Sequence, residues 1–255
     1  MAGRKGSQHS SEDSANGVVA FLLMSEQSII AINVLHEFFP ERAQAVLEVL
    51  KRENSEAHKI EEWREVQLAK FIWTLILAAS DLERAYKEKQ TSTLAWLTRN
   101  LLELSVWIQF CNMSPEHAKR FRDDAVRDLY GFSQAVQSLE LSETGAEDFE
   151  LKRSQQHLST FAQSWGIHTL GDDYQKVSGA AEEVGRGEIF RGLNKMLSKY
   201  AHPTAWAVHS LFSVEADAEL RDLFLMDGVE MATDSLTAIR NFILKSYPSP
   251  GSAII

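Results

Sequence analysis

The chain has 255 residues, of which 44% are hydrophobic and 24% are charged, and its formal net charge is -10. This length allows one large domain or two small ones, and the negative charge argues against broad binding to a phosphate backbone, so DNA is not an expected partner. The single cysteine, Cys111, excludes an intrachain disulfide and indicates a reducing, cytoplasmic compartment. Its expected role is that of a small buried apolar residue.

The first residues do not have the pattern of a targeting segment. Residues 1–16 are small and polar without periodicity, and we expect a disordered leader. The apolar run at 18–24 follows acidic residues and precedes a polar stretch, which does not fit a secretory signal. The longest apolar run, 71–79, is far shorter than the roughly 20 residues that a membrane helix needs. We therefore expect no membrane partner.

Helical periodicity covers the first half of the chain. Apolar positions three and four apart predict helices over 17–39, 40–54, 55–89 and 91–112, with Pro40 in the first turn of the second helix. The connection at 89–92 is short, so the helices on its two sides should be antiparallel neighbours. The apolar stretch 71–80 is expected to pack directly against 91–112.

Capping and breaking residues set the elements of the second half. Ser114, Pro115 and Glu116 form a helix start signal, and a helix over 114–141 should turn its apolar positions inward. These positions are Phe121, Ala125, Leu129, Phe132 and Val136. Further helices are expected over 148–165, 172–184, 188–201 and 204–212, with Pro203 ending the third of these.

The last part of the chain is acidic over 215–228, where we expect irregular structure or a short helix, with a turn at Asp227-Gly228. A final helix is predicted over 229–244, and 247–255 should form a flexible tail. No alternating strand pattern extends beyond four residues. The prediction is an all-α fold, a single helical bundle of roughly eight to ten helices in one domain over 17–246.

The stretch 91–112 carries the most informative side chains. It is apolar nearly all the way round a helix, which is typical of a helix inside a bundle. Arg99, Asn100 and Glu103 lie in its middle, and Trp96 and Trp107 follow the same stripe. A buried ion pair is often no more stable than apolar residues of similar size. Two interpretations stay open: a structural network in a dry interior, or a functional site.

A second polar group occurs near the end of the helix over 188–201, where Lys199, Tyr200 and His202 precede Pro203. Through the helix dipole, a protonated histidine stabilises a helix C-terminus, which is the structural interpretation of His202. In the functional interpretation, His202 meets Arg99 and Glu103 across the bundle, as in an acid–base site. The candidate catalytic residues are Arg99, Asn100, Glu103 and His202, and the candidate binding residues are Trp96, Trp107, Lys199, Tyr200 and His209.

Several common site motifs are missing from the sequence. It contains neither HExxH nor the ExxH pairs that a di-iron bundle uses. Only His202 and His209 share a helical face, at a spacing of seven, and no lysine with Ser/Thr follows Gly179 and Gly185 as a phosphate-binding loop requires. There is no GxSxG, and Cys111 has no base near it in sequence. We expect no metal site and no cofactor.

Two segments, TRNLLELSVWIQF and LSKYAHPTA, resemble a family of uncharacterised all-helical bacterial proteins with an Arg-x-x-x-Glu helix and a later Tyr-x-His segment. The resemblance covers 60–245 and implies the fold without an activity. A more distant likeness is to the HEPN-type helical ribonucleases of toxin–antitoxin and phage-defence systems. Arg99 and Asn100 match the start of their motif, whereas Leu104 stands where its histidine belongs, so His202 would have to substitute from another helix. Arg52 and His58 match the spacing by chance.

Two functions therefore remain open. One is a non-catalytic helical binding or interaction protein, with a homodimer or another protein as partner, in a bacterial stress or defence system. The other is a HEPN-like ribonuclease or related hydrolase that uses Arg99, Asn100, Glu103 and His202. RNA is a partner only in the second case. The distance from His202 to Arg99 and Glu103 distinguishes the two, because acid–base groups must come within hydrogen-bond reach.

Overall fold

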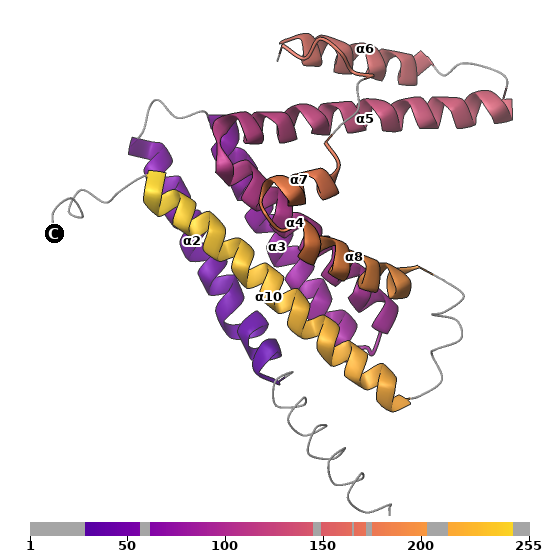
Figure 1. Cartoon of the computed structure of the whole chain (residues 1–255). Coiled ribbons are helices and arrows are strands. Elements are labelled where there is room, and N and C mark those ends of the chain that lie inside the picture. The colour runs from indigo at the N-terminus through magenta and orange to yellow at the C-terminus, as the bar shows by residue number, and fades with distance from the viewer. Residues whose placement is uncertain are drawn as a thin grey trace, which may run out of the picture. The chain divides into compact units, whose positions relative to one another are not determined.

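The computed structural model describes residues 29–56, 62–144, 149–164, 166–171, 175–202 and 214–246. Every regular element in this part of the chain is helical, so the predicted all-α fold is confirmed (Figure 1). The expected leader at 1–16, the helix at 204–212 and the tail at 247–255 lie outside the described residues. None of the described helices is both long and apolar enough to cross a membrane.

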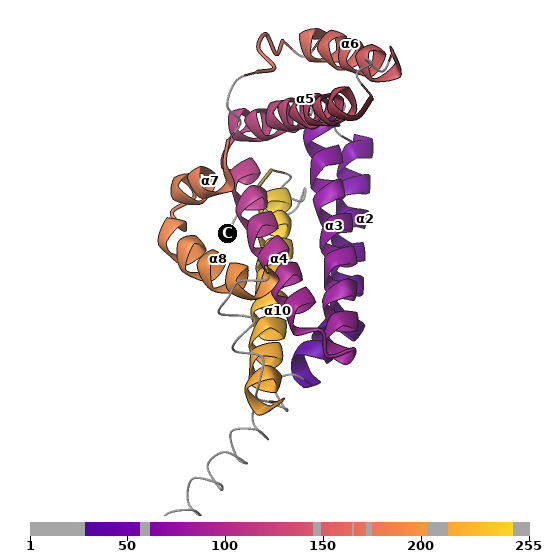
Figure 2. The same ribbon diagram turned by 90° about the vertical axis from the view of Figure 1, so that its right-hand side faces the viewer.

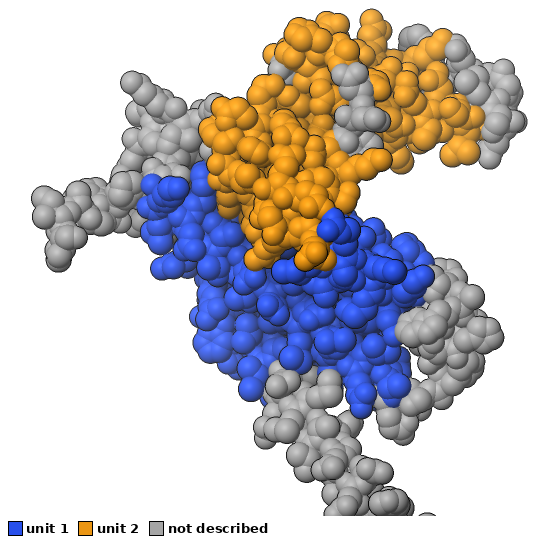
Figure 3. Space-filling model, in the orientation of Figure 1, with its two compact units in different colours: residues 1–105, 189–255 blue, residues 106–188 orange. Residues whose placement is uncertain are grey.

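The described residues form two compact units, coloured separately in Figure 3: unit 1 comprises 1–105 and 189–255, and unit 2 comprises 106–188. Two helices continue from one unit into the other. These are α4 (Thr91–Met113) and α8 (Gly187–Ala201). A single domain over 17–246 stays a prediction, because compact units do not by themselves establish independent folding.

Unit 1 is built on three helices that pack against one another: α2 (Phe39–Glu56), α3 (Glu62–Lys87) and α10 (Val214–Ser246). A π-helical turn, η1 (Val34–Phe38), leads into α2. The apolar stretch 71–80 was expected to pack against 91–112, but α3 packs mainly against α10 and α2. Figure 2 shows α10 next to α4. At this contact Thr98 donates a 2.8 Å hydrogen bond to the backbone oxygen of Phe224.

The region 215–228 differs most from the prediction. It is neither irregular nor a short helix, because α10 runs without interruption from Val214 to Ser246. The turn expected at Asp227-Gly228 is wrong. A Cβ at Gly228 would lie 2.7 Å from Leu82 Cδ2 and 3.2 Å from Thr98 Oγ1. The glycine therefore lets α10 approach α3 and α4 closely, which is a packing role rather than a turn.

Polar ties hold the N-terminal half of α10 to its neighbours. Tyr86 on α3 donates a 2.5 Å hydrogen bond to the buried carboxylate of Asp222. Thr91, the first residue of α4, donates to Asp217 at 2.6 Å, and Arg221 forms an ion pair with the same carboxylate. These bonds explain how Asp217 and Asp222 can sit in a packed helix, because each of the two carboxylates has a donor within unit 1.

Unit 2 contains α5 (Pro115–Thr144), α6 (Phe149–Ser164) and the short α7 (Val177–Glu183). α5 begins at Pro115 as predicted, and the backbone N–H of His117 donates to the capping Ser114 hydroxyl at 3.3 Å. α5 and α6 lie side by side (Figures 1 and 2), with Val126 and Ala162 buried between them.

The face of α5 that is buried is not the predicted one. Leu129 and Phe132 are more than half exposed, whereas Ala118, Val126 and Ser133 are buried. The prediction followed the largest apolar side chains. The helix instead buries a face of smaller residues, which allows α6 to pack closely against it.

Candidate functional site

Arg99 is the centre of a polar cluster that joins α4 to α8 within unit 1. Its Nε donates to Asn194 Oδ1 at 2.8 Å, and its Nη2 lies 3.0 Å from Glu103 Oε1. Its Nη1 lies 3.4 Å from His202 Nε2. All three nitrogens of the guanidinium thus have a neighbour: one on α4, one on α8, and one at the residue that follows α8. His202 therefore lies within hydrogen-bond reach of Arg99, as a shared acid–base site requires, so this distance does not exclude the ribonuclease.

The guanidinium of Arg99 can only donate to its neighbours, because it has five N–H bonds and no acceptor. The 3.4 Å contact with His202 Nε2 is therefore a hydrogen bond when that nitrogen carries no proton. With the described residues, Arg99 makes three contacts, which use at most three of its five N–H bonds.

The cluster lies at the surface of the unit rather than in its dry interior. The side chains of Arg99 and Glu103 are 27% and 30% exposed, and His202 is exposed. The expectation of an ion pair in the dry middle of a bundle is therefore wrong. It was drawn from the apolar residues around the pair, but those residues are buried on the other sides of α4. The large desolvation cost of a fully buried ion pair therefore does not apply to Arg99 and Glu103, which stay partly in contact with water.

An exposed aromatic ring extends the cluster along α4. Trp96 is 48% exposed and precedes Arg99 by three residues, so the two share one face of the helix. Asn100 and Glu103 continue this face at spacings of four and seven, and both are half-buried. We call the surface formed by these residues and their α8 neighbours the α4–α8 face. It consists of Trp96, Arg99, Asn100, Glu103, Asn194 and His202.

Four further binding residues were predicted: Trp107, Lys199, Tyr200 and His209. Tyr200 packs its ring on Phe224 of α10 at 5.2 Å, and burial raises the pKa of its hydroxyl. Lys199 is exposed on α8. Trp107 belongs to unit 2, where its ring lies 5.1 Å from that of Phe121. His209 lies outside the described residues. The structure therefore brings together Arg99, Glu103 and His202 of the predicted site residues.

Asn194 is the residue that the sequence analysis missed. It orients Arg99 through the shortest of the three contacts. The signal that could have found it is its spacing. Asn194 and Ser198 are four residues apart on one stripe of α8, and His202 follows four residues later, just beyond the end of the helix. A candidate site at His202 thus indicates Asn194 as well, because Asn194 is the polar residue about two turns before it.

A second cluster of polar side chains occurs in unit 2. Arg120 holds both carboxylate oxygens of Glu183 at 3.1 Å, and its second partner is the amide oxygen of Gln175 at 2.6 Å. His117 Nε2 lies 3.4 Å from the same carboxylate, while its Nδ1 lies 2.8 Å from the Ser114 hydroxyl. The hydrogen bond from Arg120 is the main cause of a lowered pKa at Glu183. This cluster ties α5 to α7.

One acid in unit 1, Asp227, has a raised rather than a lowered pKa. Asp227 is half-buried on α10, and burial, with a smaller contribution from Glu230, raises the pKa of its carboxyl to about 6. Among the described residues, His, Cys, Asp and Glu form no group of three that could hold a metal ion.

Comparison with known proteins identifies the family but no characterised relative. No match was found among curated proteins or among solved structures. The model of a family of unknown function, DUF5677, matches residues 76–219, which is more than half of the chain. This match contains both segments of the α4–α8 face, from Trp96 to His202, and agrees with the resemblance to an uncharacterised family. The chain belongs to the family of unknown function DUF5677.

Proposed function

We propose that the protein is a helical interaction protein and that the α4–α8 face is its contact surface for a second copy of the chain. The observation that carries the proposal is the exposed Trp96 next to the partly exposed Arg99 and Glu103. Tryptophan and arginine are the residue types most enriched among those that dominate binding energy at protein interfaces.

The charges of the face support a partner with the same surface. In an interface with two-fold symmetry, each residue of one protomer meets the matching surface of its partner. Arg99 and Glu103 lie one turn apart, so an antiparallel approach of two α4 helices sets each guanidinium against the other protomer's carboxylate. The net charge of -10 on each copy makes two chains repel one another at a distance. The attraction between Arg99 and Glu103 of the two protomers acts only after the surfaces come close, because salt screens exposed charges beyond about 10 Å.

The face is also held in place before any partner binds. Asn194 and His202 fix the guanidinium from α8, so less side-chain entropy is lost when the surface is covered. A role in a bacterial stress or phage-defence system is part of the same proposal and rests on the sequence resemblance.

Sedimentation velocity over a range of protein concentrations tests the proposal. The wild type should sediment as a dimer at the higher concentrations, and Trp96→Ala should weaken self-association at least tenfold. Trp73→Ala is the matched control, because Trp73 is 56% exposed on α3. A wild type that stays monomeric at all concentrations contradicts the proposal. So does equal self-association of the Trp96 and Trp73 variants.

A second candidate function, a HEPN-like ribonuclease, is favoured by the 3.4 Å distance between Arg99 Nη1 and His202 Nε2. An RNA phosphate that binds Arg99 would take the guanidinium away from His202. The free Nε2 could then remove the proton of a ribose 2′-hydroxyl, whose oxygen attacks the phosphorus to form a 2′,3′-cyclic phosphate. The bond from phosphorus to the 5′-oxygen breaks, and the 5′-oxygen takes a proton from water. Arg99 would stabilise the charge on the phosphate, and Asn100 and Glu103 would position the strand.

Cleavage of a fluorescent single-stranded RNA in the presence of EDTA tests this second function. His202→Gln and Arg99→Ala should each abolish cleavage while their urea-unfolding midpoints stay close to that of the wild type. His36→Gln, at an exposed histidine on η1, is the control and should cleave normally. Absence of cleavage by the wild type, or equal cleavage by all variants, excludes the ribonuclease.

A further inference from the structure

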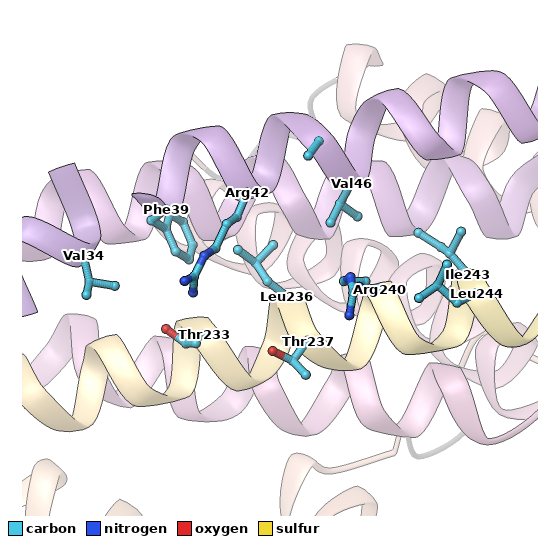
Figure 4. A pocket seen from close by; sticks show the side chains of 11 residues that line it. Val34, Phe39, Arg42, Val46, Thr233, Leu236, Thr237, Arg240, Ile243 and Leu244 are labelled. Atoms are coloured by element: carbon cyan, nitrogen blue, oxygen red, sulfur yellow. The ribbon is translucent and has the colours of Figure 1, made fainter. Parts of the chain in front are cut away.

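A separate cavity of about 370 Å³ lies along the line where α2 and η1 meet α10, within unit 1 (Figure 4). This volume is within the range of small-molecule pockets, roughly 300–1,000 Å³. Its walls are mainly apolar, with Val34, Phe39 and Val46 on one side and Leu236 and Ile243 on the other. The α4–α8 face contributes no residue to it.

Two arginines line this apolar cavity, one from each wall. Arg42 extends from α2 toward α10, and Arg240 lies on α10 between Leu236 and Ile243 (Figure 4). Both are exposed. Arg42 lies over the ring of Phe38, with its Cζ 5.9 Å from the ring centre.

Within the part of the chain that the structure describes, no carboxylate balances the charges of these two arginines. Among the described residues, neither Arg42 nor Arg240 has an ion-pair partner. Other arginines of the same unit are paired, such as Arg84 with Asp81 and Arg221 with Asp217. The chain has ten more acidic than basic residues, and yet no described carboxylate pairs with either guanidinium at this cavity.

We propose that this cavity binds a small amphipathic anion: an apolar chain or ring system with a single carboxylate or comparable anionic head. The apolar body lies against Phe39, Val46 and Leu236. The head lies between Arg42 and Arg240, which donate charge-assisted hydrogen bonds to it.

Two threonines on α10, Thr233 and Thr237, add hydroxyl donors at the same wall (Figure 4). A neutral ligand of the same length gains the apolar contacts but leaves both guanidiniums without a partner. The site therefore selects for negative charge, and selection against the neutral analogue is the property to measure.

Isothermal titration calorimetry with sodium decanoate, kept below its micellar concentration, tests the proposal. Decanoate should bind the full chain with one site, and decanol should bind at least tenfold more weakly. Acetate, which has the head without the apolar body, should not bind. Equal affinity for decanoate and decanol, or no binding of decanoate, overturns the proposal.

Variants locate the site. Arg42→Gln and Arg240→Gln should each weaken decanoate binding about tenfold or more, because a charge-assisted hydrogen bond is lost. Arg153→Gln, at an exposed arginine of α6 in unit 2, is the matched control and should bind as the wild type does. Thr237→Trp places a ring at the exposed rim of the cavity and should block binding without removing a charge. Unchanged affinity in the two arginine variants overturns the proposal, as does unchanged affinity in Thr237→Trp.

An amphipathic anion can reach the two arginines either as a free molecule or as a lipid in a membrane surface. Flotation with vesicles of phosphatidylcholine and phosphatidylglycerol separates the two sources. The proposal predicts no vesicle binding that depends on Arg42 and Arg240. Vesicle binding that both Gln variants abolish, combined with no binding of monomeric decanoate, would assign the arginines to a membrane surface and overturn the proposal.

Discussion

Replacement of Gly228 by alanine tests how closely α10 approaches α3 and α4. The new Cβ would lie 2.7 Å from Leu82 Cδ2 and 3.2 Å from Thr98 Oγ1, and both of these residues are buried. Alanine gains about 1 kcal/mol over glycine in a helix interior. Insertion of a methyl group into a packed core costs about 1–3 kcal/mol.

The hydrogen bond from Thr98 to the Phe224 oxygen lies at the same contact, and its displacement costs up to about 1 kcal/mol more. These terms give a net loss of about 0–3 kcal/mol, so we expect Gly228→Ala to lower the free energy of unfolding by about 1.5 kcal/mol, and Gly228→Val to lower it further. Gly192→Ala is the matched control, because Gly192 is an exposed helical glycine with no atom within 4 Å of its added Cβ.

Urea unfolding followed by circular dichroism measures both variants. Gly192→Ala should be more stable than the wild type by about 0.5–1 kcal/mol. If Gly228→Ala gained stability to the same extent, the close packing of the three helices at Gly228 would be refuted, and with it the reason that α10 passes through this position without a turn.

Three further predictions concern the ionisable and polar groups. Burial raises the pKa of the Asp227 carboxyl above its value in the unfolded chain, so ionisation of this group destabilises the fold. The destabilisation is absent below about pH 4 and complete above about pH 6. After allowance for partial exposure, Asp227→Asn should therefore stabilise the fold by about 1 kcal/mol at pH 7.5 and not at pH 4, measured by urea unfolding. An equal effect at both pH values would contradict this assignment. Tyr86→Phe removes the donor to buried Asp222 and should cost about 1–3 kcal/mol, measured in the same way, whereas a neutral effect would exclude this tie. Arg120→Ala removes the main cause of the lowered pKa of Glu183, so the carboxyl carbon of that residue should titrate at higher pH in NMR spectra, and an unchanged midpoint would argue against the ion pair.

Local signals in the sequence were sufficient for most helix boundaries. Ser114 and Pro115 give a start that depends only on neighbouring residues, and the helix begins there. Asp227-Gly228 has the same local appearance as a turn, but its conformation depends on Leu82, which is far away in sequence. Sequence periodicity cannot reveal that a glycine is needed for space rather than for its backbone freedom.

The sequence was sufficient to predict which residues of the candidate site meet, but not how exposed they are. The spacing of Arg99 and Glu103 on one helix and the position of His202 at the end of another allowed their contact to be anticipated. Exposure could not be anticipated, because it depends on which side of α4 its neighbours cover. The sequence analysis missed Asn194 and assigned the wrong buried face to α5 for the same reason. Which side of an amphipathic helix is buried depends on where its partner helix packs.

Charge exchange at Arg99 and Glu103, followed by sedimentation equilibrium, tests most directly the claim that the α4–α8 face pairs with a second copy of itself. Arg99→Glu and Glu103→Arg each place like charges opposite one another in a two-fold interface and should abolish self-association. The double variant Arg99→Glu/Glu103→Arg restores opposite charges and should recover the dimer. If the double variant stays monomeric, or if both single variants associate as the wild type does, the face is not the interface.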